Sequence, residues 1–311
     1  MPKLHRENGL LPMFAELHAE ERGDRLGVEV TFAIDPSIEK LAAAFYMDGS
    51  DSMRQAGNYG RGGGLFGFNF GKQRNPVQDA MHIMVPYMTQ KDADGVCRVA
   101  YWATGKQGKD LEVIGELNAE VAATFEFRGP ETFGGGTYLL PAVRDFVAYI
   151  QELRQKSDVR AAIAAIVTDG QLHDFDDLIA YTQELARAIM NNDFPRTNIV
   201  LVGVGSEIDE EQLEQLEEAT PAEYTGRDIW CHAEAATVDD LPELVAHLLD
   251  ANIPAFWGGA LLKDEQGKII QAWEDLVPAV IEFELSATAR SFTLQVGSER
   301  YTQSLEGLGE H

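Results

Sequence analysis

The chain of 311 residues contains few cysteines, few cations and no long hydrophobic run. Its two cysteines, Cys97 and Cys231, lie in apolar or aromatic surroundings, so we expect buried thiols in a reducing compartment rather than a disulfide. No stretch of about 18 or more apolar residues occurs, which excludes a membrane-spanning helix. The N-terminal segment breaks its short apolar run with charges and lacks a small-residue cleavage site, unlike a signal peptide. We therefore expect a cytoplasmic protein.

Cationic side chains are few compared with acidic ones. The chain has 25 lysines and arginines and 51 aspartates and glutamates, which gives a net charge of −26. Binding to nucleic acid requires clustered Lys and Arg, and an anionic membrane surface attracts the same residues. We expect neither partner. The acidic residues can form an evenly solvated surface or an acidic docking face, and we favour the first because diffuse charge keeps a protein soluble without creating a specific site.

Strand-like and helix-like segments alternate between residues 41 and 250. Continuous apolar runs, typical of strands buried on both faces, occupy 41–47, 161–169 and 197–205. Further strands are predicted at 95–104 and, at an edge, 228–235; helices are predicted at 76–90, 139–155, 174–192, 209–219 and 238–251. This alternation predicts an α/β fold in which a doubly wound, mostly parallel sheet carries helices on both faces.

The pattern changes after residue 254, where 279–287 and 290–304 alternate polar and apolar residues without a following helix. The early segment 27–35 alternates in the same way. We expect a main domain at 41–256, a small antiparallel β-unit at 257–311, and an N-terminal segment at 1–40 that pairs with this β-unit. The alternative is a loose hairpin laid on the main domain.

Residues 54–74 form a glycine-rich insertion with seven glycines, three phenylalanines and four cationic residues. Glycine at this density cannot hold a regular element, and a loop of this length in a compact domain is functional or disordered. A hydrophobic surface for a partner, a self-packed flap and an insertion without function all fit. Phosphate binding fits less well because no G-K-[ST] sequence follows the glycines.

Three side-chain oxygens follow the first apolar run, in the D-x-S-x-S sequence of Asp48, Ser50 and Ser52. A serine nucleophile requires a G-x-S-x-G turn, which is missing. A phosphoryl-accepting aspartate of the D-x-D type requires a carboxylate where Ser50 stands. A hard cation such as Mg²⁺ is the third possibility, because it binds oxygen ligands. Asp51 alternates away from the serines, so we expect it to face solvent.

Two more oxygen ligands are predicted at the same edge of the sheet. Thr137 follows three glycines and begins a helix, and Asp169 ends the second apolar run in the sequence IVTDG. Ligands of parallel sheets lie at the carboxyl ends of strands, where loops lead into helices. Together with Asp48, Ser50 and Ser52, these residues predict a metal site.

In this order, D-x-S-x-S, G-G-T and T-D-G resemble the metal-ion-dependent adhesion site of the von Willebrand factor A (vWA) domain. The segments 92–105, 135–143 and 240–257 most resemble the bacterial tellurium and toxic-cation resistance proteins of that family. The resemblance covers residues 41–256. It implies that Asp48, Ser50, Ser52, Thr137 and Asp169 bind Mg²⁺, with Mn²⁺ or Ca²⁺ as alternatives. It also implies a protein partner that supplies an Asp or Glu carboxylate to the metal.

We therefore expect a non-enzymatic, metal-dependent protein-interaction module of a bacterial stress or tellurium-resistance system. An Mg²⁺-dependent hydrolase with His173 or Asp174 as its base is one alternative. A partner subunit of an AAA-type ATPase is another, because some vWA proteins serve in that way. A degenerate domain that binds no metal is the third.

Overall fold

The structure, a computed structural model, describes residues 3–4, 9–33, 40–60, 74–205, 208–224, 228–252, 254–274 and 276–306. Within the glycine-rich insertion 54–74, residues 61–73 lie outside the described residues. The chain divides into two compact units. We call Pro36–Leu248 the α/β unit, and Met1–Asp35 together with Leu249–His311 the β unit.

The α/β unit is built on a six-stranded sheet in the order β6-β5-β4-β7-β8-β9. All neighbouring pairs are parallel except β5 and β6. The strands are β4 (Leu41–Asp48), β5 (Val96–Thr104), β6 (Asp110–Asn118), β7 (Ala161–Thr168), β8 (Arg196–Val204) and β9 (Trp230–Ala235). The predicted α/β class with a mostly parallel sheet is confirmed.

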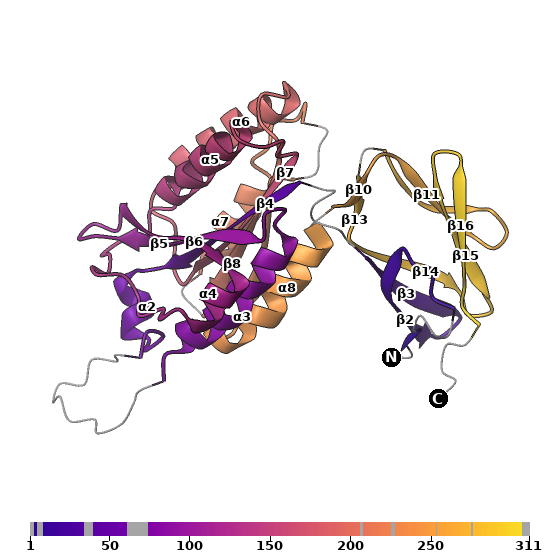
Figure 1. Ribbon diagram of the computed structural model, residues 1–311, viewed down its shortest axis with the longest axis horizontal. Coiled ribbons are helices and arrows are strands. Elements are labelled where there is room, and N and C mark those ends of the chain that lie inside the picture. Colours follow the sequence, from indigo (N-terminus) through magenta and orange to yellow (C-terminus); the bar gives the residue numbers. More distant parts are fainter. Residues whose placement is uncertain are drawn as a thin grey trace. The chain divides into compact units, whose positions relative to one another are not determined.

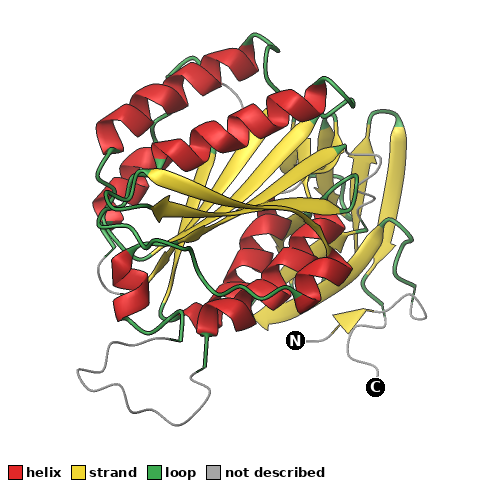
Figure 2. Ribbon diagram, turned by 60° about the vertical axis from the view of Figure 1, so that its left-hand side comes forward, coloured by secondary structure: helices red, strands yellow, loops and turns green. Residues whose placement is uncertain are grey.

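Helices cover both faces of this sheet (Figures 1 and 2). Helices α5 and α6 lie on one face, and α3, α4 and α8 lie on the other (Figure 1). The helices are α2 (Asp51–Gln55), α3 (Pro76–Lys91), α4 (Ala119–Thr124), α5 (Leu140–Arg154), α6 (Phe175–Met190), α7 (Glu210–Glu217), the 3₁₀ helix η2 (Val238–Asp240) and α8 (Leu241–Asn252). No described helix is long and apolar enough to span a membrane.

The central strands β4 and β7 are buried along their whole length, as their apolar runs predict. Even-numbered residues of β4 pack with α5 and α6 in one cluster that includes Tyr46, Phe146 and Leu185. Pairing is in register from Leu41 with Ala161 onward, so the carboxyl ends of β4 and β7 meet at one edge of the sheet. This edge carries the predicted site residues Asp48 and Asp169.

The β unit contains two four-stranded sheets, β1-β2-β3-β14 and β12-β11-β15-β16, and the pair β10-β13. Its strands are β1 (Lys3–Leu4), β2 (Phe14–Arg22), β3 (Arg25–Phe32), β10 (Pro254–Trp257), β11 (Ala260–Asp264), β12 (Ile269–Trp273), β13 (Leu276–Pro278), β14 (Val280–Ser286), β15 (Ser291–Val296) and β16 (Glu299–Ser304). Strand β3 pairs antiparallel with β14, so segments from both ends of the sequence share a sheet. Residues of both sheets, including Phe14 and Phe292, form one apolar core.

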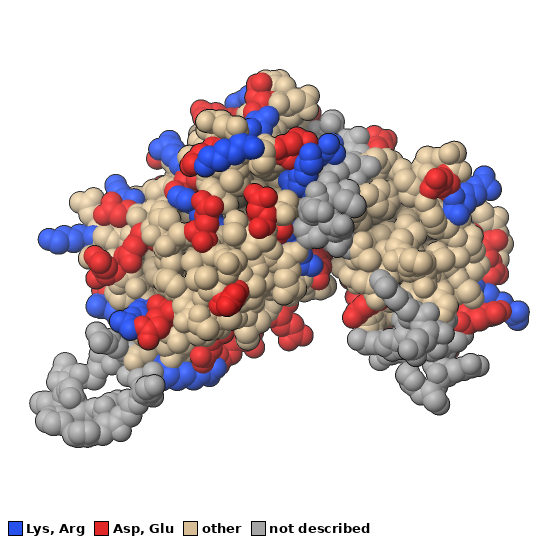
Figure 3. All heavy atoms as spheres, viewed as in Figure 1, with Lys and Arg blue, Asp and Glu red and all other residues tan. Residues whose placement is uncertain are grey.

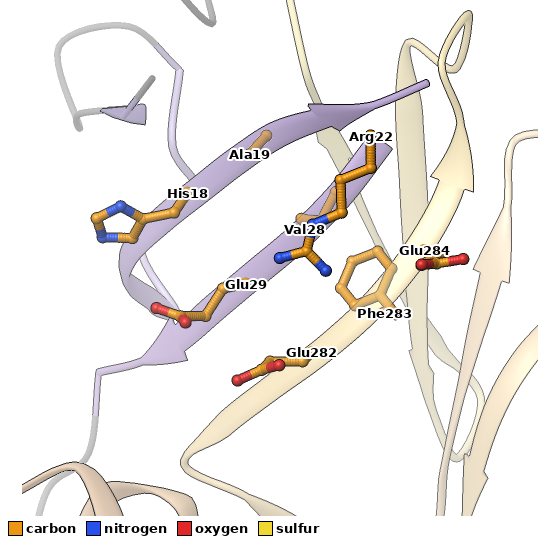
Figure 4. A pocket seen from close by; sticks show the side chains of 9 residues that line it. His18, Ala19, Arg22, Val28, Glu29, Glu282, Phe283 and Glu284 are labelled. Atoms are coloured by element: carbon orange, nitrogen blue, oxygen red, sulfur yellow. The ribbon is translucent and has the colours of Figure 1, made fainter. Parts of the chain in front are cut away.

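One face of the first sheet of the β unit carries a hollow of about 260 Å³ (Figure 4). The register places His18 opposite Glu29 and Glu29 opposite Glu282, so three adjacent strands contribute to it. Gly27 lacks a side chain there, and the Arg22 guanidinium lies over it, with Cζ 3.2 Å from where a Cβ would stand. Its lining is mixed, because the charged side chains lie beside Ala19, Val28 and Phe283, which belong to the apolar core.

Charged side chains of the α/β unit are of both signs on the face seen in Figure 3, where Lys and Arg alternate with Asp and Glu. Exposed cations of the α/β unit also form ion pairs with neighbouring acids, such as Lys156 with Glu152 and Lys40 with Asp158. The acidic excess is therefore not gathered into one docking patch on this face.

Candidate metal centre

The D-x-S-x-S segment forms the turn between β4 and α2. The Ser50 backbone N–H donates to Asp48 Oδ1 over 2.7 Å, and Ser50 is the N-cap of α2. Gly49 is required at the turn, because a Cβ there would lie 2.9 Å from both Pro130 Cγ and Thr104 Cγ2. The chain therefore passes from the end of β4 directly into α2, with Ser50 bridged to Gly134 between the two elements.

Asp169 follows β7 and meets both serines. Ser52 Oγ donates to Asp169 Oδ1 over 2.8 Å, Ser50 Oγ lies 3.3 Å from the same oxygen, and the two hydroxyl oxygens are 2.9 Å apart. The Asp169 backbone N–H also lies 3.4 Å from Asp48 Oδ2. The structure thus brings four of the five predicted residues into one group of oxygens.

Thr137, the fifth predicted residue, follows the glycine run and lies near Gly170, the residue after Asp169. Gly134 N donates to Gly49 O over 3.1 Å, and Asp51 N donates to Gly134 O over 2.8 Å, so the glycine run is tied to the D-x-S-x-S turn. A Cβ on Gly134 would lie only 2.0 Å from Ala103 O, so no other residue fits this approach. Thr137 is buried, and its Oγ1 lies 3.7 Å from where a Cβ on Gly170 would stand.

Asp48 is fully buried, and no cation among the described residues forms an ion pair with it. Burial and the nearby Asp169 carboxylate together raise the pKa of Asp48 to about 7. Hydrogen bonds from Ser50 favour the ionised form but do not offset these two effects. Two carboxylates held close together in a buried site favour a bound cation, because a cation removes the repulsion between them.

The donor set fits a hard divalent cation. Two carboxylates and three hydroxyls are oxygen ligands of the kind that Mg²⁺, Mn²⁺ and Ca²⁺ bind, whereas zinc sites use nitrogen and sulfur. The described residues contain no group of three or more His, Cys, Asp or Glu side chains placed to hold a metal. A metal in this part of the chain would therefore depend on the serine and threonine hydroxyls.

Two residues that support the site were not singled out from the sequence. The Tyr59 hydroxyl donates to the backbone oxygen of Asp48, and its ring packs against Tyr101 and Phe133 at 6.0 and 5.1 Å between centroids. Thr168 Oγ1 donates to Asp48 Oδ2 over 3.2 Å. The sequence T-D-G contains Thr168, so its neighbour Asp169 could have drawn attention to it; nothing in the sequence indicates Tyr59.

His173 and Asp174, the candidate bases of a hydrolase, both have backbone partners. His173 Nδ1 accepts from Thr137 N over 2.8 Å. Asp174 accepts from the backbone N–H groups of Leu139 and Leu140, one on each carboxylate oxygen, at 2.9 and 2.8 Å. These contacts place Asp174 at the start of α5, where a negative charge is favoured.

Asp51, expected to face solvent, lies in the first turn of α2. Its side chain is 39% exposed and forms an ion pair of 2.6 Å with Arg54. The guanidinium of Arg54 also stacks over Phe133, 5.1 Å from the ring centroid. Asp51 therefore contributes to the rim of the turn, and its side chain is bound to a neighbour on α2.

No model of a known protein family matches this chain, and no curated protein matches it. Among solved structures, it is similar to the pilus adhesin SpaC from Lactobacillus rhamnosus GG, with a TM-score of 0.44, 10% identity, and coverage of 97% of this chain and 48% of that chain. It thus spans about half the length of the SpaC structure. The SpRpn10 VWA domain has a TM-score of 0.42 and 13% identity, over 64% of this chain and 92% of that one. Manganese-loaded Plasmodium vivax TRAP has a TM-score of 0.41 and 11% identity, over 90% and 96%.

Proposed function

We propose that this chain is a metal-dependent protein-interaction module whose α/β unit is of the vWA type. Asp48, Ser50, Ser52, Thr137 and Asp169 would hold Mg²⁺ or Mn²⁺, and a partner protein would add an Asp or Glu carboxylate. The observation that carries the proposal is the convergence of Ser50, Ser52 and Asp169 beside the buried Asp48, with the Ser52 and Asp169 oxygens 2.8 Å apart.

The charges of the donor set support a carboxylate-bearing partner. Two aspartates balance the charge of a divalent cation when both bind it directly, and the three hydroxyls are neutral. If one aspartate binds only through water, the ligand shell keeps a net positive charge. Such a shell attracts an anionic ligand, and a carboxylate oxygen is one that Mg²⁺ and Mn²⁺ accept.

The contacts of the candidate bases support binding over hydrolysis. A general base must reach the proton that it removes, either directly or through one water. His173 Nδ1 and both Asp174 oxygens already accept backbone hydrogen bonds of 2.8 to 2.9 Å. These atoms hold loops in place, which favours a non-enzymatic role for the site.

A thermal-shift experiment tests the metal site. Mg²⁺ or Mn²⁺ should raise the melting temperature of the wild-type protein, and Asp48→Ala or the Ser50→Ala/Ser52→Ala double variant should remove that rise. Asp92→Asn is the matched control, because it changes another buried aspartate of the same unit and should keep the response. An equal metal response in Asp48→Ala would rule out the assignment.

The partner can be tested separately from the metal. A partner captured from the native host in Mg²⁺ should be released by a chelator and should not bind Asp169→Ala. A partner that stays bound in chelator would contradict the metal-mediated contact.

We further propose that this contact serves a bacterial stress or tellurium-resistance system, as the sequence resemblance implies. Disruption of the gene should make the host more sensitive to tellurite. Complementation with the wild type, but not with Asp48→Ala, should restore resistance. Unchanged sensitivity after disruption would contradict this role.

A further inference from the structure

Four hydrogen bonds join the loop after β7 to the segment at the start of α5. His173 accepts from Thr137 N through Nδ1 and donates its own backbone N–H to Thr137 O over 2.9 Å. Asp174 accepts from Leu139 N and Leu140 N. Both backbone groups of Thr137 are thus bound by a single residue, His173.

The imidazole is held in the orientation that this contact needs. Its ring stacks on Tyr138, with centroids 5.5 Å apart and planes 27° from parallel. Lys109 Nζ also contacts Tyr138, 4.4 Å from the ring centroid. Because Nδ1 accepts a hydrogen bond, the ring proton is assigned to Nε2.

Thr137 needs such support because of the residues before it. Gly134, Gly135 and Gly136 lack side chains, so the backbone that leads to Thr137 has little stiffness of its own. The N–H and C=O groups of Thr137 are both bound to His173. These bonds define the direction of the Thr137 side chain relative to the loop that carries Asp169. The contact therefore links two predicted ligands that come from different loops.

We propose that His173 is a positioning residue of the metal site, which sets metal affinity by orienting Thr137 without touching the metal. This inference rests on the proposed function. Partners of ligand residues commonly change metal affinity about 10–100-fold when they are removed. The hydrogen-bond acceptor at Nδ1, not the aromatic ring, is the part of His173 that carries this effect.

Two substitutions separate the acceptor from the ring. His173→Phe keeps an aromatic ring on Tyr138 and removes the acceptor. His173→Asn removes the ring and keeps an acceptor oxygen at the position of Nδ1. Titration calorimetry with Mn²⁺ should show a Kd about tenfold higher for His173→Phe and a Kd within about threefold of wild type for His173→Asn.

His82→Phe is the matched control, because His82 also makes a ring hydrogen bond, of 2.8 Å to Phe125 O, within the same unit. Its Mn²⁺ affinity should equal that of the wild type. Melting temperatures without metal show whether each variant is folded. If His173→Phe is not folded, His173→Gln replaces it, since the longer side chain moves the acceptor away, and the same tenfold loss is expected.

A wild-type affinity in His173→Phe would overturn the inference, and so would an equal loss in the Asn and Phe variants. Either result would leave the proposed function in place, because the wild type would still bind Mn²⁺ in an Asp48-dependent way. A wild type that binds no Mn²⁺ would instead overturn the proposed function and the inference with it.

Discussion

An aspartate is buried at each end of the strands of the six-stranded sheet, Asp48 at their carboxyl ends and Asp92 at their amino ends. Asp92 accepts three backbone N–H groups, from Ala43 and Asp94 at 2.8 Å and from Val96 at 3.4 Å. Asp48 accepts from backbone too, but it lies near a second carboxylate and beside hydroxyls. Its surroundings can donate hydrogen bonds and can also bind a cation.

The difference shows how a structural carboxylate can be told from a ligand. The backbone N–H groups that bind Asp92 are donors only, so these partners cannot bind a metal. Hydroxyl and carboxylate oxygens can bind a cation directly, so the surroundings of Asp48 can. Burial alone does not separate the two, because it raises the pKa of both, to about 7 for Asp48 and about 6 for Asp92.

A third carboxylate, Asp145, differs from both because the guanidinium of Arg98 neutralises its charge. Arg98 donates to its two oxygens over 2.8 and 2.7 Å, and Tyr46 donates over 2.8 Å. Arg98→Met should lower the free energy of unfolding by about 3 kcal/mol, because it leaves a mostly buried charge without its partner. Urea denaturation measures this, and Arg98→Met/Asp145→Leu should recover most of it. A loss below about 1 kcal/mol in the single variant would show that Asp145 does not need its cation.

Asp92 should make stability depend on pH. Its folded pKa of about 6 lies above its ordinary value of 3.8, so its contribution is fully present below about pH 4 and is lost as the pH rises through 6. The loss is at most about 3 kcal/mol. Relative to the wild type, Asp92→Asn should therefore gain stability between pH 4 and 7 in metal-free urea denaturation. A difference in unfolding free energy between the two proteins that stays constant across this range would contradict the raised pKa of Asp92.

Asp48→Asn should stabilise the metal-free protein at pH 8, which is unusual for a change at a buried polar residue. The amide removes the charge that burial and Asp169 disfavour, while Thr168 Oγ1 can accept from its N–H. We expect a gain of about 2 kcal/mol, after the lost hydrogen bonds are deducted. Mg²⁺ should stabilise only the wild type. The difference in stability between the two proteins should therefore become smaller or change sign. A variant less stable than the wild type without metal would place Asp48 with Asp92 as a structural carboxylate.

The pairing of Asp48 and Asp169 at one edge could be predicted because both follow long apolar runs. Strands of this kind lie in the middle of a parallel sheet, and their carboxyl ends share an edge. Strand β6 and helix α4 were not predicted. As an edge strand, β6 is mostly half-exposed, and register shifts and Gly115, at φ +138°, break its alternation.

The supporting contacts of the site could not be predicted either. Tyr59 reaches Asp48 from beyond α2, and His173 reaches Thr137 across 36 positions of the sequence. Both contacts depend on the paths of loops, which no periodicity in the sequence describes. The ligands follow from the order of the strands, whereas the residues that hold them follow from loop conformation.

The pairing of β3 with β14 has a consequence for synthesis on the ribosome. Strand β3 emerges early, but its partner is made only after the whole α/β unit between them. At about 5–20 residues per second, the β2–β3 hairpin waits on the order of 10 to 50 seconds with its apolar face uncovered. During that time Phe14, Val30 and Phe32 are available to chaperones or to another nascent chain.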